Sequence, residues 1–199
     1  MIVILLGMLG FALVHSITAD KRVKGWMGQT LGERFQHGWY RLFYNVLSVI
    51  SLAPIFLYMA TRSEVIYSVS GISIIIFRVI QVIGLVGAAI SILQIDWMRF
   101  VGLRQVMAYF SGAELPLSSE ALKTDGVYGF VRHPLYFFSL LFLWLNPTMT
   151  DAALYFNIAA SAYFVFGSII EERRMRDYYG EHYKAYQARV PWLIPFIGR

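Results

Sequence analysis

The sequence has 199 residues, of which 58% are hydrophobic, and its formal net charge is +5. Soluble domains are usually about 45–50% apolar and lack long apolar runs, so this composition excludes an ordinary soluble domain. The chain has no cysteine, which excludes disulfides, thiolate metal sites and a cysteine nucleophile. Its four histidines are well separated, so no zinc-ligand spacing is present and we expect no metal.

Five apolar segments follow one another along the chain, at residues 2–18, 41–60, 72–95, 135–149 and 152–170. A bilayer core about 30 Å thick requires roughly 20 helical residues, and helices satisfy their backbone groups internally. We therefore predict an all-α integral membrane protein with about five membrane helices. No basic region precedes the first segment and it shows no small-residue cleavage pattern, so we interpret it as a retained helix and not as a signal peptide.

The basic residues indicate the orientation of these helices. With the N-terminus outside, loops 19–41 and 96–134 and the C-terminal tail lie inside, and they contain every lysine and arginine of the 17 except Arg62 and Arg78. This asymmetry follows the positive-inside rule and predicts a cytoplasmic C-terminal tail. The positive charge is then explained by topology and by attraction to anionic lipid headgroups, so a nucleic-acid partner is not expected.

The last two segments predict a tight helical hairpin. Residues 135–149 would form a helix of about 22 Å, which is short for a full span. The sequence Asn146-Pro147-Thr148 then reverses the chain, because proline cannot continue a helix and restricts the residue before it. Such a hairpin brings its two open ends together, so residues 126–136 are expected to lie near residues 171–174.

The residues at these two ends suggest a binding site for a ligand with both negative and positive groups. Pro134 suits the first turn of a helix, whose free N–H groups favour an anion, and Arg132 and His133 stand beside it. Glu171 and Glu172, on the other side, would suit a cation or a ribose diol. Two simpler interpretations stay open: Arg132 and His133 could anchor a helix at the headgroups, and the glutamates could belong to a solvated helix end.

Three stretches of the sequence carry a resemblance to a known family: GVYGFVRHPLYFF at 126–138, NPTMT at 146–150, and EERRMRDYYGEHYKAYQARVPWLIPF at 171–196. Together they resemble the isoprenylcysteine carboxyl methyltransferase superfamily, membrane methyltransferases that use S-adenosylmethionine. The same stretches are most similar to the methanethiol S-methyltransferase branch. His15-Ser16 and Arg41-Leu42-Phe43-Tyr44-Asn45 are instead similar to a functionally vague branch associated with nitrite and nitric-oxide reduction clusters.

The resemblance implies S-adenosylmethionine as the cofactor and a bacterial inner membrane as the location. It implies three helices in residues 1–95 and a methyltransferase core in residues 96–199. It assigns Glu171, Glu172 and Arg132 to catalysis, and a tail containing Pro191 that folds over the cofactor. The cofactor-binding residues that it implies are Arg132, His133, Pro134, Tyr136, Glu171, Tyr183 and Tyr186.

The chain also departs from the superfamily pattern. Gly129 stands where the family often has Arg or Lys, and Phe166 and Gly167 stand where the prenylcysteine enzymes have Arg, about five residues before the glutamate pair. A substrate carboxylate would lose its cationic partner, so we predict a small or lipophilic acceptor, a thiol, amine or lipid, in preference to a carboxylate. The alternative is a non-catalytic membrane protein or a transporter linked to nitrogen-oxide metabolism, although a transporter usually shows charge within its spans or paired halves.

Three further polar positions have open interpretations. His15, near the inner end of the first helix, is expected to make a structural hydrogen bond, with a functional role as the alternative. Asn45 and the group Asp96-Trp97-Arg99 could either anchor the chain at the interface or line an acceptor pocket.

Overall fold

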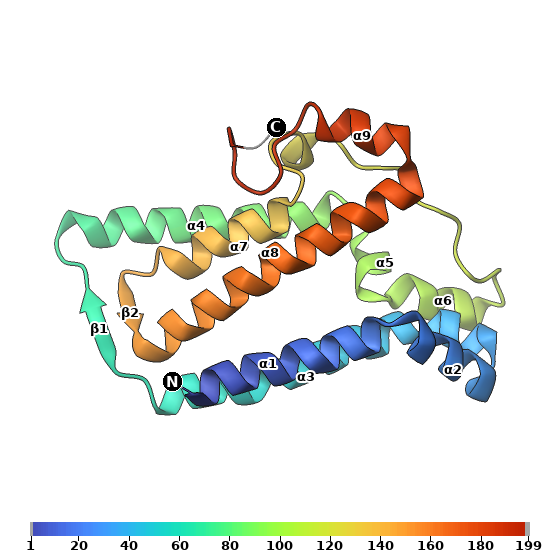
Figure 1. Ribbon diagram of the computed structural model, residues 1–199, viewed down its shortest axis with the longest axis horizontal. Helices are drawn as coiled ribbons and strands as arrows, with labels where there is room; N and C mark the ends of the chain where they lie inside the picture. The colour runs from blue at the N-terminus through green and yellow to red at the C-terminus, as the bar shows by residue number, and fades with distance from the viewer. Residues whose placement is uncertain (1, 198–199) are drawn as a thin grey trace. The chain divides into compact units, whose positions relative to one another are not determined.

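A computed structural model describes residues 2–197, most of which are helical (Figure 1). The elements in chain order are α1 Ile2–Ala19, α2 Lys21–Leu31, α3 Glu33–Thr61, β1 Val65–Ser68, α4 Ile72–Leu93, α5 Trp97–Val101, α6 Leu103–Ser111, the 3₁₀ helix η1 Gly126–Gly129, α7 Pro134–Trp144, β2 Thr148–Thr150, α8 Asp151–Tyr179 and α9 Glu181–Gln187.

Four helices of the described chain, α1, α3, α4 and α8, are long and apolar enough to cross a bilayer. The protein is therefore an integral membrane protein of the all-α class, as predicted. The fourth apolar segment differs from the prediction, because α7 ends at Trp144 after 11 residues, about 17 Å of helix. Helix cannot continue through Asn146 because Pro147 follows it, and Thr148–Thr150 pair with β1 instead.

Contacts within the chain define two compact units. The first contains the residues up to Arg62 together with Asp96–Glu120, and the second contains Ser63–Ile95 together with Ala121–Arg199. The third predicted apolar segment, now α4, thus belongs with the C-terminal hairpin. The sequence predicted three membrane helices in residues 1–95 and a methyltransferase core in residues 96–199. That division concerns which segment carries out the reaction, and it stays a prediction.

In the first unit, α1 packs along α3, and α2 and α6 also contact α3. Polar contacts explain the residues that the sequence singled out. Arg41 Nε donates to the carbonyl of Phe100 at 2.9 Å, and Asn45 Nδ2 donates to the carbonyls of Phe100 and Val101 at 3.0 and 2.8 Å. Because the last carbonyls of a helix have no partner within it, Arg41 and Asn45 act as a cap for α5.

The other polar positions of this unit also have structural partners. His15 Nδ1 lies 2.9 Å from Ser48 Oγ, and its Nε2 contacts the Tyr44 hydroxyl, so the expected structural hydrogen bond is confirmed. Asp96 accepts from the backbone N–H of Arg99 at the start of α5 and forms an ion pair with Arg104 at 2.6 Å.

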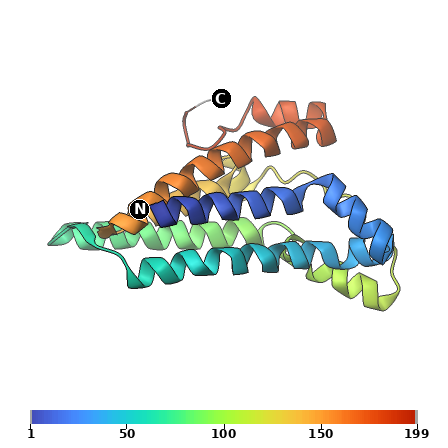
Figure 2. The ribbon, with the colours of Figure 1, turned by 60° about the horizontal axis from the view of Figure 1, so that its bottom comes forward.

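In the second unit, α4 and α7 lie side by side (Figure 1, Figure 2). Two glycines of α4 make this close approach possible. A Cβ atom at Gly84 would lie 2.8 Å from the carbonyl oxygen of Phe138, and one at Gly87 would overlap the Phe138 ring. The buried Gln81 adds a polar contact, because its Nε2 donates to the carbonyl of Phe142 at 3.1 Å.

The closed end of the hairpin is fixed by a short antiparallel pairing of β1 with β2, in which Val65 lies opposite Thr150. Thr150 Oγ1 caps α8 by accepting from the N–H of Ala153 at 3.1 Å, the usual role of threonine at this position. The sequence thus correctly predicted a hairpin with its turn at 146–151, and the open ends of α7 and α8 carry the candidate site.

Candidate functional site

The head of α7 is joined to the C-terminal tail through the backbone. Pro134 occupies the first turn of α7 and is fully buried, and its missing N–H costs nothing there. The N–H of Arg132 donates to the carbonyl of Pro191 at 2.9 Å, and the N–H of His133 donates to that of Trp192 at 3.2 Å. The tail is therefore held against the start of α7; that it folds over a cofactor, as the resemblance implied, stays a prediction.

Glu172 is the centre of the polar network. Arg132 binds it through two hydrogen bonds, Nε to Oε1 at 2.8 Å and Nη2 to Oε2 at 3.2 Å. Oε1 also accepts from Tyr183 Oη at 2.9 Å and contacts His133 Nε2 at 3.0 Å, and Oε2 accepts from Gln187 Nε2. Both side chains of the ion pair are 8% exposed, so the carboxylate of Glu172 is buried with every oxygen occupied.

Arg132 connects the hairpin to the tail a second time. Its Nη1 donates to the carbonyls of Val190 at 2.6 Å and Gln187 at 3.3 Å. The sequence suggested Arg132 as a partner for an anionic ligand, and in the structure the Arg132 charge is balanced by Glu172. His133, the other basic residue before α7, contacts both glutamates: its Nδ1 lies 3.5 Å from Glu171 Oε2 and its Nε2 lies 3.0 Å from Glu172 Oε1.

Glu171 differs sharply from its neighbour, because successive residues of a helix point about 100° apart. Its side chain is 41% exposed. Oε2 accepts from the Tyr136 hydroxyl at 3.3 Å and lies 3.5 Å from His133 Nδ1. Oε1 makes no hydrogen bond within residues 2–197, so this oxygen is available to a ligand.

Aromatic rings extend from this carboxylate along the hairpin. The Tyr136 ring is stacked between His133, at a centroid distance of 5.6 Å, and Phe164, at 5.1 Å. Gly167 lies one turn before Glu171 on the same helix and next to the Tyr136 hydroxyl: a Cβ atom at Gly167 would lie 3.8 Å from that oxygen. The exposed carboxylate, the phenol and the small residue therefore share one place on the hairpin.

The pKa of His133 results from opposing influences. Burial lowers it, but hydrogen bonds and charge interactions with Glu171 and Glu172 outweigh burial, so the pKa is raised above its ordinary value. Burial and the negative charge of Glu172 raise the pKa of the Tyr183 phenol, which keeps it a neutral donor. Burial, with the charge of Glu171, raises the pKa of Tyr128 to about 12.

Tyr186 connects the C-terminal tail to η1 through a hydrogen bond. Its hydroxyl donates to the carbonyl of Tyr128 at 2.6 Å, and the Tyr128 hydroxyl donates to the carbonyl of Ser91 on α4 at 3.0 Å. The tail, η1 and α4 are thereby connected, and Tyr183, Tyr186 and Val190 form a small buried cluster.

The structure brings together nearly all of the predicted residues: Arg132, His133, Tyr136, Glu171, Glu172 and Tyr183 are in direct contact, while Pro134 and Tyr186 support them. Sequence reasoning missed Gln187, Phe164, Tyr128 and Trp192. Gln187 could have been found, because it follows Tyr183 by four residues and so lies on the same face of α9.

Residues 16–190 match the family described as protein of unknown function DUF1295. The chain belongs to this family. It is 35% identical over 196 residues to the methanethiol S-methyltransferase of Crocosphaera subtropica, covering 97% of this chain and 74% of that protein. It is 33% identical to methanethiol S-methyltransferase 2 of Bradyrhizobium diazoefficiens, covering 93% of this chain and 69% of that protein.

A more distant relative is the methanethiol S-methyltransferase of Mycobacterium tuberculosis, which is 26% identical over 98% of this chain and 78% of its own length. These similarities confirm the resemblance that the motifs of the sequence indicated. No solved structure matches the chain.

The raised pKa of His133 predicts a pH-dependent stability. A group whose pKa is higher in the folded than in the unfolded state contributes stability below its unfolded pKa and loses it as pH rises through the folded value. The melting temperature in detergent should therefore fall as pH rises above about 6.5, and His133→Gln should flatten this part of the profile. The exposed His182 supplies the control, since His182→Gln should keep the wild-type profile. Parallel profiles for wild type and His133→Gln would contradict the assignment.

Proposed function

We propose that this protein is an integral membrane methyltransferase that moves the methyl group of S-adenosylmethionine to a small, neutral acceptor, with a thiol favoured. Support comes from the similarity of almost the whole chain to proteins named methanethiol S-methyltransferase. The structural observation that carries the proposal is the contrast between a saturated, buried Glu172 and an exposed Glu171 on adjacent positions of α8.

The residues present fit this methyl donor, whose sulfonium and amino groups are positive. The exposed carboxylate of Glu171, which accepts a hydrogen bond from the Tyr136 hydroxyl, offers the negative charge that attracts a cation. In this proposal, Glu171 and Tyr136 touch the donor, and His133 and Pro134 form the wall at the head of α7. Tyr183 and Tyr186 hold the tail against it.

When bound, the donor supplies an activated methyl group, so the protein needs mainly to position the reactants and exclude water. Held by Glu171 and Tyr136, the donor would supply both the methyl group and a sulfur able to keep the electron pair of the bond that breaks. A thiol acceptor must also lose its proton. We assign that proton to Glu171 Oε1, which is exposed and makes no hydrogen bond within residues 2–197, and from there to solvent.

Glu172 and Arg132 have a different role in this scheme. Each oxygen of Glu172 already accepts at least two hydrogen bonds, so it has no capacity left for a substrate proton. We therefore propose Glu172 and Arg132 as positioning residues that hold the tail and the head of α7, and Glu171 as the catalytic base.

The preference for a neutral acceptor follows from the charges beside Gly167. An incoming carboxylate would meet the negative charge of Glu171, and neither Phe166 nor Gly167 supplies a cation on this part of α8. Moving an unpaired carboxylate out of water is costly. A thiol or amine enters without charge and can give its proton to Glu171.

The proposed reaction predicts that Glu171 is needed for transfer but not for the fold. Purified protein in detergent should bind S-adenosylhomocysteine in a calorimetric titration and should methylate methanethiol from labelled S-adenosylmethionine. Glu171→Gln should keep a cooperative thermal transition and lower the transfer rate by at least about 100-fold, the usual scale for loss of a general base. Efficient ester formation on a prenylcysteine analogue, with no transfer to thiols, would overturn the proposal.

We further propose that α7 and residues 145–150 cross the bilayer together as a fifth span, with the N-terminus outside and the tail in the cytoplasm. The distribution of lysine and arginine supports this orientation. In a chain without native cysteine, Ile66→Cys should react with an impermeant maleimide added to intact cells, whereas Lys21→Cys should react only after permeabilisation. The reverse pattern would show the orientation to be wrong.

A further inference from the structure

Helix α6 of the first unit lies beside the start of α3 (Figure 1). Ala108 is 8% exposed, and a Cβ atom at Gly38 of α3 would lie 2.8 Å from the Cβ atom of Tyr109, so the two helices approach closely there. Arg34 of α3 adds hydrogen bonds, because its Nη2 donates to the carbonyls of Ala108 and Tyr109 at 3.4 and 3.1 Å. Helix α6 therefore contacts α3 through Ala108, Tyr109 and backbone groups.

The apolar face of α6 points away from this contact. Leu103, Met107 and Phe110 follow one another at spacings of four and three residues, which places them on one face of the helix. Ala108 points about 100° away from Met107 and about 160° away from Phe110. Met107 is 59% exposed and Phe110 is 72% exposed, so this face is largely uncovered in the part of the chain that the structure describes.

The position of α6 along α3 indicates what covers this face. Helix α3 is long enough to cross a bilayer, and its apolar segment was predicted at residues 41–60. The Phe110 ring lies beside Trp39, with centroids 5.8 Å apart, and Trp39 precedes that segment by two residues, about 3 Å of helix. At the other end of α6, Gly102 lies against the backbone of Leu42. The exposed face is therefore at the depth where headgroups meet acyl chains.

The side chains around α6 fit that boundary. Trp39, Tyr109 and Phe110 pack edge to face with one another, and tryptophan and tyrosine are enriched at the level of the headgroups. Arg34 and Arg104 are exposed, and cations at this level are attracted to anionic lipid headgroups. An apolar helix face with aromatic and basic neighbours is typical of helices that lie in a membrane interface.

We propose that α6 is an interfacial helix, and that Leu103, Met107 and Phe110 insert between the lipids of the leaflet that α3 enters at its N-terminal end. Lipid then covers the exposed face. The segment between the third and fourth apolar segments, expected to lie inside as a loop, thus contains a membrane anchor. The inference concerns the first unit alone and does not rest on the proposed function.

The test uses the absence of native cysteine, which allows a single nitroxide label on the full chain in lipid nanodiscs. Met107→Cys and Phe110→Cys report on the apolar face. Val49→Cys on α3, at a position 70% exposed within the apolar segment, is the lipid-facing control, and Ser119→Cys in the exposed loop is the water-facing control. Power saturation measures collisions of each label with oxygen, which concentrates in lipid, and with a nickel chelate, which stays in water.

We expect the labels of Met107→Cys and Phe110→Cys to collide with oxygen more often than with the chelate, as in Val49→Cys, and Ser119→Cys to show the reverse. More collisions with the chelate at both α6 positions would place this face in water and overturn the inference. Few collisions with either reagent would show protein against the face, the second unit or, with spin–spin broadening, a second copy, and would also overturn it. Since both side chains are exposed, both variants should fold, and either one alone gives the comparison with the controls.

Discussion

The buried ion pair between Arg132 and Glu172 is the interaction on which the rest of the site depends. Arg132 precedes α7, Glu172 lies on α8, and three tail groups, Tyr183, Gln187 and the Val190 carbonyl, complete the bonds of the pair. Taking two charges out of water is expensive, so such a pair contributes little net stability, but removing one partner leaves an uncompensated buried charge. The pair therefore specifies one arrangement of hairpin and tail, and that arrangement determines which carboxylate stays exposed.

This constraint explains how two adjacent glutamates can differ so much. Glu172 points into the network, where each oxygen is occupied, and Glu171 points along the helix face that also carries Gly167. Tyr136 is the link, because its ring packs between His133 and Phe164 while its hydroxyl reaches Glu171. In the proposed function, Glu172 positions the tail and the head of α7, and Glu171 receives the proton. The two roles differ because adjacent residues of a helix point in different directions.

The membrane helices were predictable from the sequence, because apolar runs of about 20 residues indicate such helices directly. The hairpin followed from Pro147, and the joining of Arg132 and His133 to Glu171 and Glu172 followed from the hairpin. The end of α7 at Trp144 was not predictable, because it depends on the pairing of β2 with the distant β1. The partners of Arg132 were missed for a similar reason: a sequence shows a charge but not the carboxylate with which it pairs.

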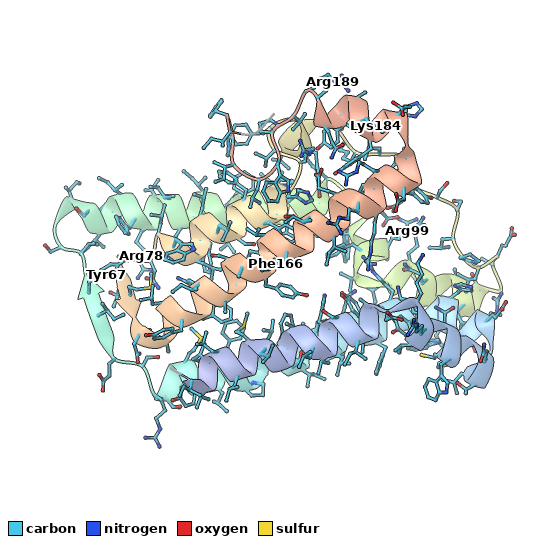
Figure 3. All side chains as sticks on the ribbon, viewed as in Figure 1. Tyr67, Arg78, Arg99, Phe166, Lys184 and Arg189 are labelled. Carbon is cyan, nitrogen blue, oxygen red and sulfur yellow. The ribbon has the colours of Figure 1, made fainter. Side chains whose placement is uncertain are left out.

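The attachment of the tail by Glu172 can be measured by limited proteolysis. Lys184 and Arg189 lie exposed on α9 and just after it (Figure 3), and trypsin cleaves there when the tail opens, at a rate that follows the population of the open form. Glu172→Gln keeps the shape but removes the charge that pairs with Arg132, so cleavage should accelerate at least about tenfold, the effect of 1.4 kcal/mol, whereas Glu171→Gln should be cleaved at the wild-type rate. Equal cleavage of Glu172→Gln and wild type would contradict the account.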